Sequence, residues 1–253
     1  MEKLTIIKVG GAIVEDDSRL DNLLGRFATL PGHKILVHGG GRRATKVAAA
    51  LGIESRMVEG RRVTGRQMLD VVTMVYAGLV NKNIVARLDA KGIRALGLTG
   101  ADATVIRSEK RPITNGTDYG YVGDVKEVNG PQLQAFLEQG LTPVLAPLTF
   151  DAEGRLLNTN ADTIAGETAC AMAGLYDTTL IYCFEKKGVM GDDGSVIPHL
   201  NRARFEALKA SGTLSGGMIP KVENALLAVE RGVRRVFITQ ATAIDGQEGT
   251  IIQ

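Results

Sequence analysis

The stretch LVHGGGRR, residues 36–43, joins a short apolar run to three consecutive glycines and then to the start of a helical pattern. A second apolar run, LTIIKV at residues 4–9, is followed by another pair of glycines. Where a strand turns into a helix, the first helical N–H groups have no partner within the helix and can bind anions. Both turns therefore predict a parallel α/β sheet with an anion site at the carboxyl edge of its strands.

Short β-rich runs and helical stretches alternate along the rest of the chain, which predicts an α/β fold with an open, mostly parallel sheet covered by helices. The predicted strands are residues 4–9, 34–37, 94–98, 141–146, 179–183 and 235–239. The predicted helices are residues 43–51, 67–91, 131–139, 161–173, 203–211 and 218–231. Two stretches, 57–63 and 104–128, are typical of β-hairpins. The loops expected to share one rim of the sheet are residues 10–11, 38–41, 97–100 and 184–188.

The composition is that of an ordinary globular chain of 253 residues, which suits one large domain or two tightly joined lobes. Lys plus Arg number 30 against 28 acidic residues, a net charge of +2, which argues against nucleic acid as a main partner. No apolar run approaches the length of a membrane span, and the N-terminal apolar stretch is too short for a secretory signal. Cys170 and Cys183 lie in apolar stretches without a CxxC spacing, so we expect buried free thiols and a cytoplasmic location.

Two lysines are candidates for binding an anion. Lys8 lies near the end of an apolar strand, with only Val9 between it and the pair Gly10 and Gly11, and a buried ammonium group is costly unless it meets a negative charge. Lys221 lies one turn into a helix that begins after the glycine pair of GGMIPK, residues 216–221, and could reach a phosphate there. Alternatively, Lys8 lies in an edge strand with its ammonium group in water, and Lys221 is a solvated surface residue. The three histidines show no metal-ligand spacing, so no protein metal site is expected.

Two further motifs carry polar side chains next to predicted elements. NTNAD, residues 158–162, precedes a helix, so Asn158, Asn160 and Asp162 either cap that helix or hold a carboxylate and orient a lysine. GRRVT, residues 60–64, brings Arg62 to a hairpin end, where it either binds a carboxylate or is solvated. Gly39, Gly41 and Ala44 fit a loose dinucleotide fingerprint, which keeps an NAD-dependent oxidoreductase open. The sequence has no GxxxxGK[ST], GxSxG, HRD or DFG motif.

In this order, KVGGA, VHGGG, GRRVT, NTNAD and GGMIPK resemble the amino acid kinase family, and within it the kinases of acylated glutamate. The terminal EGTIIQ is similar to the closing strand of that family. The resemblance implies an open αβα sandwich, with residues 1–173 binding the acylated amino acid and forming a homodimer, and residues 174–253 binding ATP. It implies ATP-dependent phosphorylation of the γ-carboxylate of N-acetyl-L-glutamate in arginine biosynthesis, with Mg²⁺ held mainly by the nucleotide phosphates.

The resemblance also assigns roles to individual residues. Lys8 and Lys221 would stabilise the transferring phosphoryl group, and Asp162 would hold both lysines. The residues implied to bind the substrate are Gly40, Gly41, Arg62, Asn158 and Asn160. The residues implied to bind ATP are Gly10, Gly11, Thr213, Leu214 and Ser215. Because only three residues precede the first predicted strand, we expect a homodimer without the N-terminal helix of the arginine-inhibited hexamers in the family.

One turn departs from the family pattern, and several alternatives for the acceptor and the function remain open. CFEKKG, residues 183–188, replaces the usual Asp-Val-x-Gly turn, and Lys186 and Lys187 either contact phosphate or are solvated. The acceptor could instead be carbamate, aspartate, uridylate or carrier-bound aminoadipate, and a non-catalytic amino-acid sensor is a further alternative. N-succinyl-L-glutamate is also open, because both hairpins are rich in basic residues that could bind a second carboxylate or simply be solvated: Arg56, Arg61, Arg66, Arg107, Lys110 and Arg111.

Overall fold

The computed structural model describes residues 1–58, 60–214, 216–246 and 248–253. Its main sheet is mostly parallel, with β1 (Lys3–Val9) between β2 (His33–His38) and β11 (Asp177–Phe184). From one edge to the other the strand order is β12-β14-β13-β11-β1-β2-β8-β5. The remaining strands of this sheet are β5 (Ala95–Leu98), β8 (Thr142–Leu145), β12 (His199–Leu200), β13 (Arg235–Gln240) and β14 (Thr250–Ile252), and β14 runs antiparallel to β13. The predicted open, mostly parallel sheet is confirmed.

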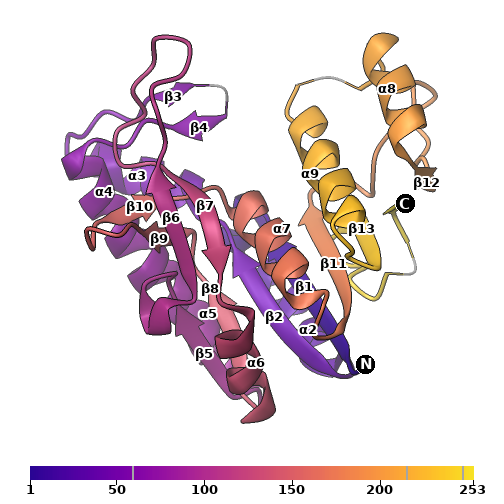
Figure 1. Ribbon diagram of the computed structural model, residues 1–253, viewed down its shortest axis with the longest axis horizontal. Coiled ribbons are helices and arrows are strands. Elements are labelled where there is room, and N and C mark those ends of the chain that lie inside the picture. Colours follow the sequence, from indigo (N-terminus) through magenta and orange to yellow (C-terminus); the bar gives the residue numbers. More distant parts are fainter. Residues whose placement is uncertain (59, 215, 247) are drawn as a thin grey trace.

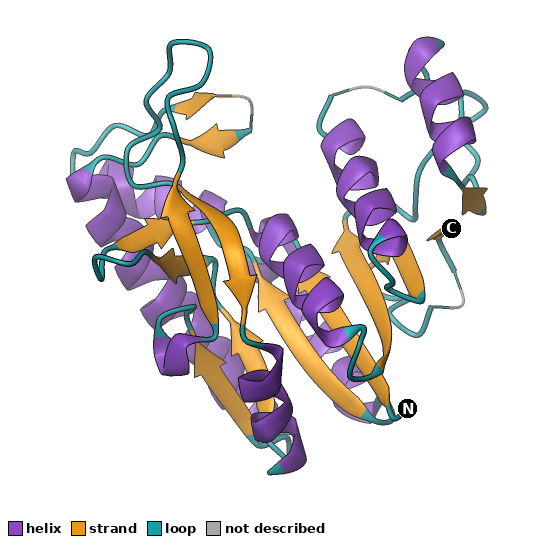
Figure 2. Ribbon diagram, viewed as in Figure 1, coloured by secondary structure: helices purple, strands orange, loops and turns teal. Residues whose placement is uncertain are grey.

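Helices cover both faces of this sheet, so the fold is an αβα sandwich (Figures 1 and 2). The alternation within β1 shows why, because Leu4 and Ile6 pack into one hydrophobic core and Ile7 and Val9 into the other. The first core is covered by α6 (Gly130–Glu138), α7 (Ala161–Met172), α8 (Arg202–Ala210) and α9 (Met218–Glu230). The second core is covered by α2 (Asp17–Thr29), α3 (Gly41–Ala50), α4 (Arg66–Val72) and α5 (Asn81–Asp89).

The sequence prediction missed α2, which follows the short helix α1 (Gly11–Val14). Asp16 caps α2 by accepting hydrogen bonds from the N–H groups of the residues two and three positions later. Its buried residues Leu20, Leu23, Leu24 and Phe27 have helical spacing, so the signal was present in the sequence. The predicted helix 67–91 is one helical run, but residues Thr73–Val80 between α4 and α5 are π-helical.

Both predicted hairpins are present. The first is β3 (Met57–Val58) with β4 (Arg61–Arg62), and the second pairs β6 (Ile106–Lys110) with β7 (Gly123–Val128). The second hairpin belongs to a smaller sheet whose other strands, β9 (Leu148–Phe150) and β10 (Leu156–Asn158), were not predicted. Figure 1 shows the β3–β4 hairpin and the N-terminal end of α9 on opposite sides of the carboxyl edge of the main sheet.

The main sheet is continuous across the lobe boundary predicted near Gly174, since β11 pairs with β1 from Lys3–Asp177 to Val9–Cys183. The helical run Arg66–Asp89 is long and apolar enough to cross a membrane by length and composition. Half of its most apolar window is buried inside the molecule, as in a core helix. The carboxyl ends of β1, β2 and β11 meet at the centre of the sheet, which is the place where open α/β sheets bind ligands.

Candidate active site

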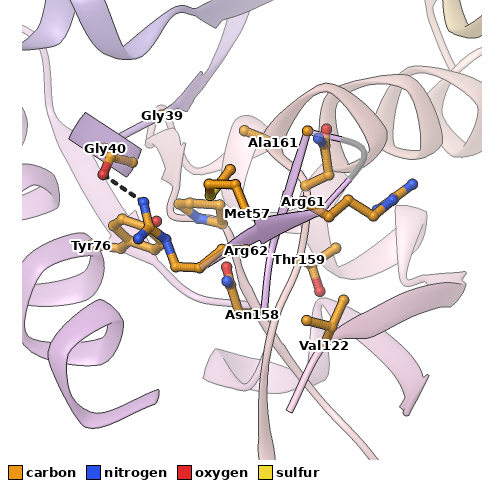
Figure 3. Close-up of a pocket in the computed structure, with 14 residues that line it drawn as sticks. Gly39, Gly40, Met57, Arg61, Arg62, Tyr76, Val122, Asn158, Thr159 and Ala161 are labelled. Atoms are coloured by element: carbon orange, nitrogen blue, oxygen red, sulfur yellow. Dashed lines mark hydrogen bonds between the residues drawn. The ribbon is translucent and has the colours of Figure 1, made fainter. Parts of the chain in front are cut away.

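Two cavities share the glycine turn that follows β2. The larger one, here called the lysine cavity, has a volume of about 650 Å³ and is lined by Lys8, Lys221 and the loops at residues 10–13, 39–42 and 184–186, among others. The smaller one, here called the arginine pocket, has a volume of about 180 Å³. Figure 3 shows residues around it, including Arg61, Arg62, Tyr76 and Asn158. Three of the four predicted rim loops thus meet, whereas residues 97–100 are not among the described residues that line either cavity.

The glycine turns after β1 and β2 are in direct contact. A Cβ atom on Gly11 would lie 3.7 Å from the backbone nitrogen of Gly40 and 3.8 Å from that of Gly41. A Cβ atom on Gly39 would lie 3.1 Å from the nitrogen of Gly11, so a larger residue there would push the turns apart. Within the described residues, the N–H groups of Gly11, Gly40 and Gly41 have no backbone or side-chain acceptor. These amides form a cluster of donors suited to an anion between the two cavities.

Lys8 is buried and paired with Asp162, with 2.6 Å between Nζ and Oδ1. Asn160 caps α7, because its Oδ1 accepts hydrogen bonds from the N–H groups of Asp162 at 2.8 Å and Thr163 at 3.2 Å. Of the three residues considered as helix caps, Asn160 is the one that caps α7, which leaves the carboxylate of Asp162 available for Lys8.

Lys221 extends from the first turn of α9 toward the same place. Its Nζ lies 3.9 Å from the centroid of the Phe184 ring, and Nζ of Lys8 lies 4.8 Å from that centroid. Burial lowers the pKa of Lys221, the carboxylate of Asp162 raises it, and the charge of Lys8 lowers it. Two ammonium groups therefore face one aromatic ring and one carboxylate, a positive excess that favours an anionic ligand.

Tyr182 supports this arrangement from inside the sheet. Its ring is fully buried and stacks on Phe184 at 6.1 Å between centroids with planes 3° apart. Its hydroxyl donates a hydrogen bond to the backbone carbonyl of Asp162 at 3.1 Å. Burial and the nearby carboxylate raise the pKa of Tyr182 well above its ordinary value, so the hydroxyl keeps its proton. Strand β11 thereby fixes both the ring that the two lysines face and the start of α7.

Arg62 is buried at the wall of the arginine pocket and ties the β3–β4 hairpin to α3. Its guanidinium donates to the carbonyl of Gly41 at 2.8 Å, to Oγ1 of Thr45 at 2.9 Å, and to Ser55. Tyr76 lies beside it, and burial raises the pKa of that phenol. A guanidinium has five N–H donors, so Arg62 keeps further donors for a ligand.

Asn158 also lines this pocket, and its Nδ2 donates to Oγ1 of Thr64 at 2.9 Å, which leaves its carbonyl oxygen for other partners. Asn160 lines the pocket as well, and its cap uses only Oδ1, so its amide NH₂ is not needed by the helix. The structure therefore brings together Gly40, Gly41, Arg62, Asn158 and Asn160, all the residues predicted to bind the acceptor.

The predicted nucleotide residues are only partly brought together. Gly10 and Gly11 line the lysine cavity. Thr213 donates to a carboxylate oxygen of Asp192 at 2.7 Å, and Leu214 is buried in the core, so neither lines the cavities described above. Ser215 lies outside the described residues. In the atypical turn, Lys186 lines the lysine cavity and Lys187 is not among its described lining residues.

The basic residues of the hairpins have different surroundings. Arg61 lines the arginine pocket, whereas Arg111 pairs with Asp124 at 2.9 Å and lies over the ring of Tyr119. Lys110 and Arg66 lie 3.7 Å from the carboxylates of Asp118 and Asp70, respectively. Of the arginines considered for a second carboxylate, Arg61 is thus the one placed at the pocket.

Several residues of the site were not predicted as such: Thr45, Ser55, Tyr76, Tyr182 and Phe184. Phe184 directly follows Cys183 at the end of an apolar strand, and the unusual turn was the signal that marked its position. The others are polar or aromatic residues whose role depends on contacts between distant segments. Within the described residues, no group of three or more His, Cys, Asp or Glu side chains could hold a metal ion.

Paired lysines and a cluster of glycine amides at the carboxyl edge of an αβα sandwich define a site for phosphoryl-group chemistry. The sequence profile described as the amino acid kinase family matches residues 3–240, so the chain belongs to that family. Its full-length relatives within the family include acetylglutamate kinases. That of Bacteroides thetaiotaomicron is 60% identical over 255 residues and aligns with 100% of this chain and 99% of its own length. The acetylglutamate kinase of Methanopyrus kandleri is 41% identical, and the alignment covers 99% of this chain and 100% of that protein.

Solved structures agree with the fold. The protein smu.665 from Streptococcus mutans is 29% identical and superposes with a TM-score of 0.82, covering 99% of this chain and 98% of that one. The carbamate kinase from Giardia lamblia bound to AMP-PNP is 14% identical and superposes with a TM-score of 0.70. The superposition covers 99% of this chain and 98% of that one. The family membership replaces the oxidoreductase alternative that rested on the spacing of Gly39, Gly41 and Ala44.

Proposed function

We propose that this protein transfers the γ-phosphoryl group of ATP to the γ-carboxylate of N-acetyl-L-glutamate, a step of arginine biosynthesis. The observation that carries the proposal is the pair of lysines in the lysine cavity, which meets the arginine pocket at one cluster of glycine amides. One cavity is large and cationic, as a nucleotide triphosphate requires, and the other is small and lined by polar side chains. The names of the full-length relatives support N-acetylglutamate as the acceptor.

The chemistry needs charge stabilisation more than proton transfer. A carboxylate is ionised near pH 7, so one of its oxygens can attack the γ-phosphorus without a general base. A P–O bond forms, the bond to the bridging β–γ oxygen breaks, and ADP leaves. Both reactants are anions, so positioning and neutralisation of charge are the main tasks of the protein. Lys8 and Lys221 supply that charge, Asp162 orients Lys8, and the amides of Gly11, Gly40 and Gly41 donate to oxygens of the transferring group.

The remaining roles follow from position. Arg62, Asn158 and Asn160 hold the α-carboxylate and the amide of the acceptor in the arginine pocket. Gly10 and Gly11 approach the phosphates of ATP. The contacts of Thr213, Leu214 and Ser215 with the nucleotide rest on the family resemblance alone. Mg²⁺ bound with ATP would be held mainly by the nucleotide phosphates and would add charge stabilisation to that of Lys8, Lys221 and the glycine N–H groups that line the lysine cavity.

We further propose a cytoplasmic homodimer with an acceptor-binding lobe over residues 1–173 and a nucleotide-binding lobe over residues 174–253. The helical run Arg66–Asp89 leaves Met74 56% and Leu79 41% exposed, an apolar surface that a second copy could cover. The cysteines are free, and burial raises the pKa of Cys183 to about 12, as expected of an inert thiol in a reducing compartment.

One observation keeps N-succinyl-L-glutamate as a second acceptor. Arg61 lines the arginine pocket, where a guanidinium could bind the extra carboxylate of a succinyl group. If succinyl is the natural acyl group, Arg61→Ala should abolish a preference for it, while Arg111→Ala, which removes a residue paired with Asp124, should leave the preference unchanged.

The test measures ADP release from ATP with N-acetylglutamate, N-succinylglutamate, aspartate, carbamate and UMP as acceptors. Hydroxylamine is added in a parallel reaction, because it converts an acyl phosphate into a stable hydroxamate. We expect ADP and hydroxamate in equal amounts with an acylated glutamate. ADP release that needs no acceptor, or that occurs only with carbamate or UMP, would contradict the proposal.

A further inference from the structure

His38 is a fully buried histidine that lines neither cavity, although it directly precedes the glycine turn they share. It is the last residue of β2. Its Nδ1 lies 2.8 Å from the carbonyl oxygen of Gly39, and its Nε2 lies 3.1 Å from Nδ2 of Asn81. Asn81 is itself buried, at the first position of α5 after the π-helical residues Thr73–Val80.

The hydrogen-bond partners of Asn81 determine which ring nitrogen of His38 carries the proton. Nδ2 of Asn81 lies 2.9 Å from the carbonyl oxygen of Val144, which can only accept. Nζ of Lys82, which can only donate, lies 3.2 Å from Oδ1 of Asn81. The amide NH₂ therefore faces both Val144 and His38. Nε2 of His38 must accept, so Nδ1 carries the proton and donates to Gly39.

This donation fixes the orientation of one peptide group. The peptide that joins Gly39 to Gly40 is trans, so its carbonyl and its N–H point in opposite directions. With the carbonyl held toward His38, the N–H of Gly40 points away from this buried ring, and Gly40 itself lines both cavities. That N–H has no acceptor within the described residues.

We propose that His38, oriented by Asn81, is a positioning residue that holds the Gly39–Gly40 peptide so that the Gly40 N–H faces the transferring phosphoryl group. The inference rests on the proposed kinase function for the identity of that group. A glycine peptide without such a restraint could turn over, since glycine has no Cβ to limit its backbone. The carbonyl would then face the anion, which would replace an attraction by a repulsion.

Two other features support a fixed turn. Burial and, to a smaller extent, the charge of Lys82 lower the pKa of His38 to about 4, so the imidazole is neutral at neutral pH and Nε2 remains an acceptor. Tyr76, one of the π-helical residues before Asn81, also packs against the turn. A Cβ atom on Gly40 would lie 2.9 Å from the Tyr76 ring. Tyr76 in the π-helical segment and Asn81 directly after it thus both restrain the turn.

Two substitutions of His38 distinguish a role in positioning the glycine turn from a role in core packing. In His38→Asn the amide nitrogen can take the place of Nδ1, so the donation to Gly39 is retained. In His38→Gln the amide reaches the place of Nε2, so the contact with Asn81 is retained and the donation to Gly39 is lost. Glutamine is also closer to histidine in size, so a packing role alone would favour His38→Gln.

The experiment measures kcat, KM and melting temperature for the wild-type enzyme and both variants. We expect kcat of His38→Asn within about fivefold of wild type and kcat of His38→Gln lower by roughly tenfold to a hundredfold, with KM values changed by less than about threefold. A kcat for His38→Gln equal to or above that of His38→Asn would overturn the proposal. A wild-type enzyme without ATP-dependent activity would instead contradict the proposed function.

A second measurement does not depend on activity or on the folding of a variant. Long-range proton–nitrogen NMR of the wild-type protein labelled with ¹⁵N-histidine reports the tautomer of each of the three histidines. The buried ring should be neutral at pH 7 with its proton on Nδ1, and it is recognised by a chemical shift that does not titrate between pH 6 and 8. A proton on Nε2, or a ring charged at pH 7, would overturn the proposal.

Discussion

The lysine cavity and the arginine pocket border the same glycine turn, but their cationic groups have different partners. In the arginine pocket, the guanidinium of Arg62 already donates to Gly41, Thr45 and Ser55. In the lysine cavity, Lys8 pairs with the carboxylate of Asp162, and both Lys8 and Lys221 lie over the ring of Phe184. The pocket is therefore organised before a ligand binds, whereas the cavity has a positive excess that a ligand must neutralise.

This difference separates recognition from catalysis. Substitutions in the arginine pocket should weaken acceptor binding and raise KM. Substitutions in the lysine cavity should reduce the stabilisation of charge in the transition state and lower kcat. The following predictions test the separation, beginning with the largest expected effect.

Lys8→Ala and Lys221→Ala should each lower kcat by a hundredfold or more, about 3 kcal/mol, because each removes one fixed charge beside the transferring group. The measurement is steady-state ADP release at saturating substrates. Lys209→Ala is the matched control, since this exposed lysine pairs with Glu223 away from both cavities, and it should leave kcat unchanged. Near-normal turnover in either site variant would remove that lysine from the mechanism.

Asp162→Ala should lower kcat by roughly tenfold to a hundredfold, because Lys8 loses its orienting carboxylate. It should lower stability little through α7, since Asn160 and not Asp162 caps that helix. Asn160→Ala should show the opposite pattern, with stability reduced by about 1 kcal/mol and a raised KM for the acceptor. Kinetics and thermal melts of both variants decide the matter. A loss of stability without a loss of kcat in Asp162→Ala would make that residue structural.

Phe184→Leu should lower kcat by about threefold to tenfold, because a lysine over an aromatic face gains about 1 kcal/mol that leucine does not provide. The two ammonium groups would be less well oriented but would keep their charge, so the effect should be smaller than that of removing either lysine. Kinetics with ATP and the acceptor varied in turn provide the test. A change confined to KM for the acceptor would assign Phe184 to the arginine pocket instead.

The stability of the protein should fall between pH 7 and pH 5.5 by about 1 kcal/mol through His38 alone. The pKa of His38 is about 4 in the folded protein against an ordinary 6.5, so the unfolded chain binds a proton in this range and the folded chain does not. Stability from this group is complete above pH 6.5 and is lost as the pH falls toward 4. Urea unfolding of wild type and His38→Asn should show a shallower pH dependence for the variant. Equal slopes would mean that His38 is not neutralised by burial.

The sequence was sufficient to predict the role of a residue where that role depends on its neighbours in the chain. The glycine turns at Gly10 and Gly40, the lysine near the end of β1 and the helix after NTNAD follow from local patterns of strand, glycine and cap. Leu20, Leu23 and Phe27 carried an equally local signal for α2 that was not used. The other misses depend on tertiary contacts. That Asn160 caps while Asp162 pairs with Lys8, or that Phe184 faces two lysines, depends on how β1, β11, α7 and α9 pack.

The central claim is that a carboxylate oxygen attacks the γ-phosphorus of ATP. It is tested by a reaction with N-acetylglutamate that carries oxygen-18 in its γ-carboxylate, followed by hydroxylamine, which attacks the acyl carbon and releases phosphate. Phosphorus NMR then reports whether the phosphate carries the label. The account predicts one oxygen-18 atom in each phosphate formed, because the bridging oxygen comes from the acceptor. Phosphate without the label would show that water, not the carboxylate, attacked ATP.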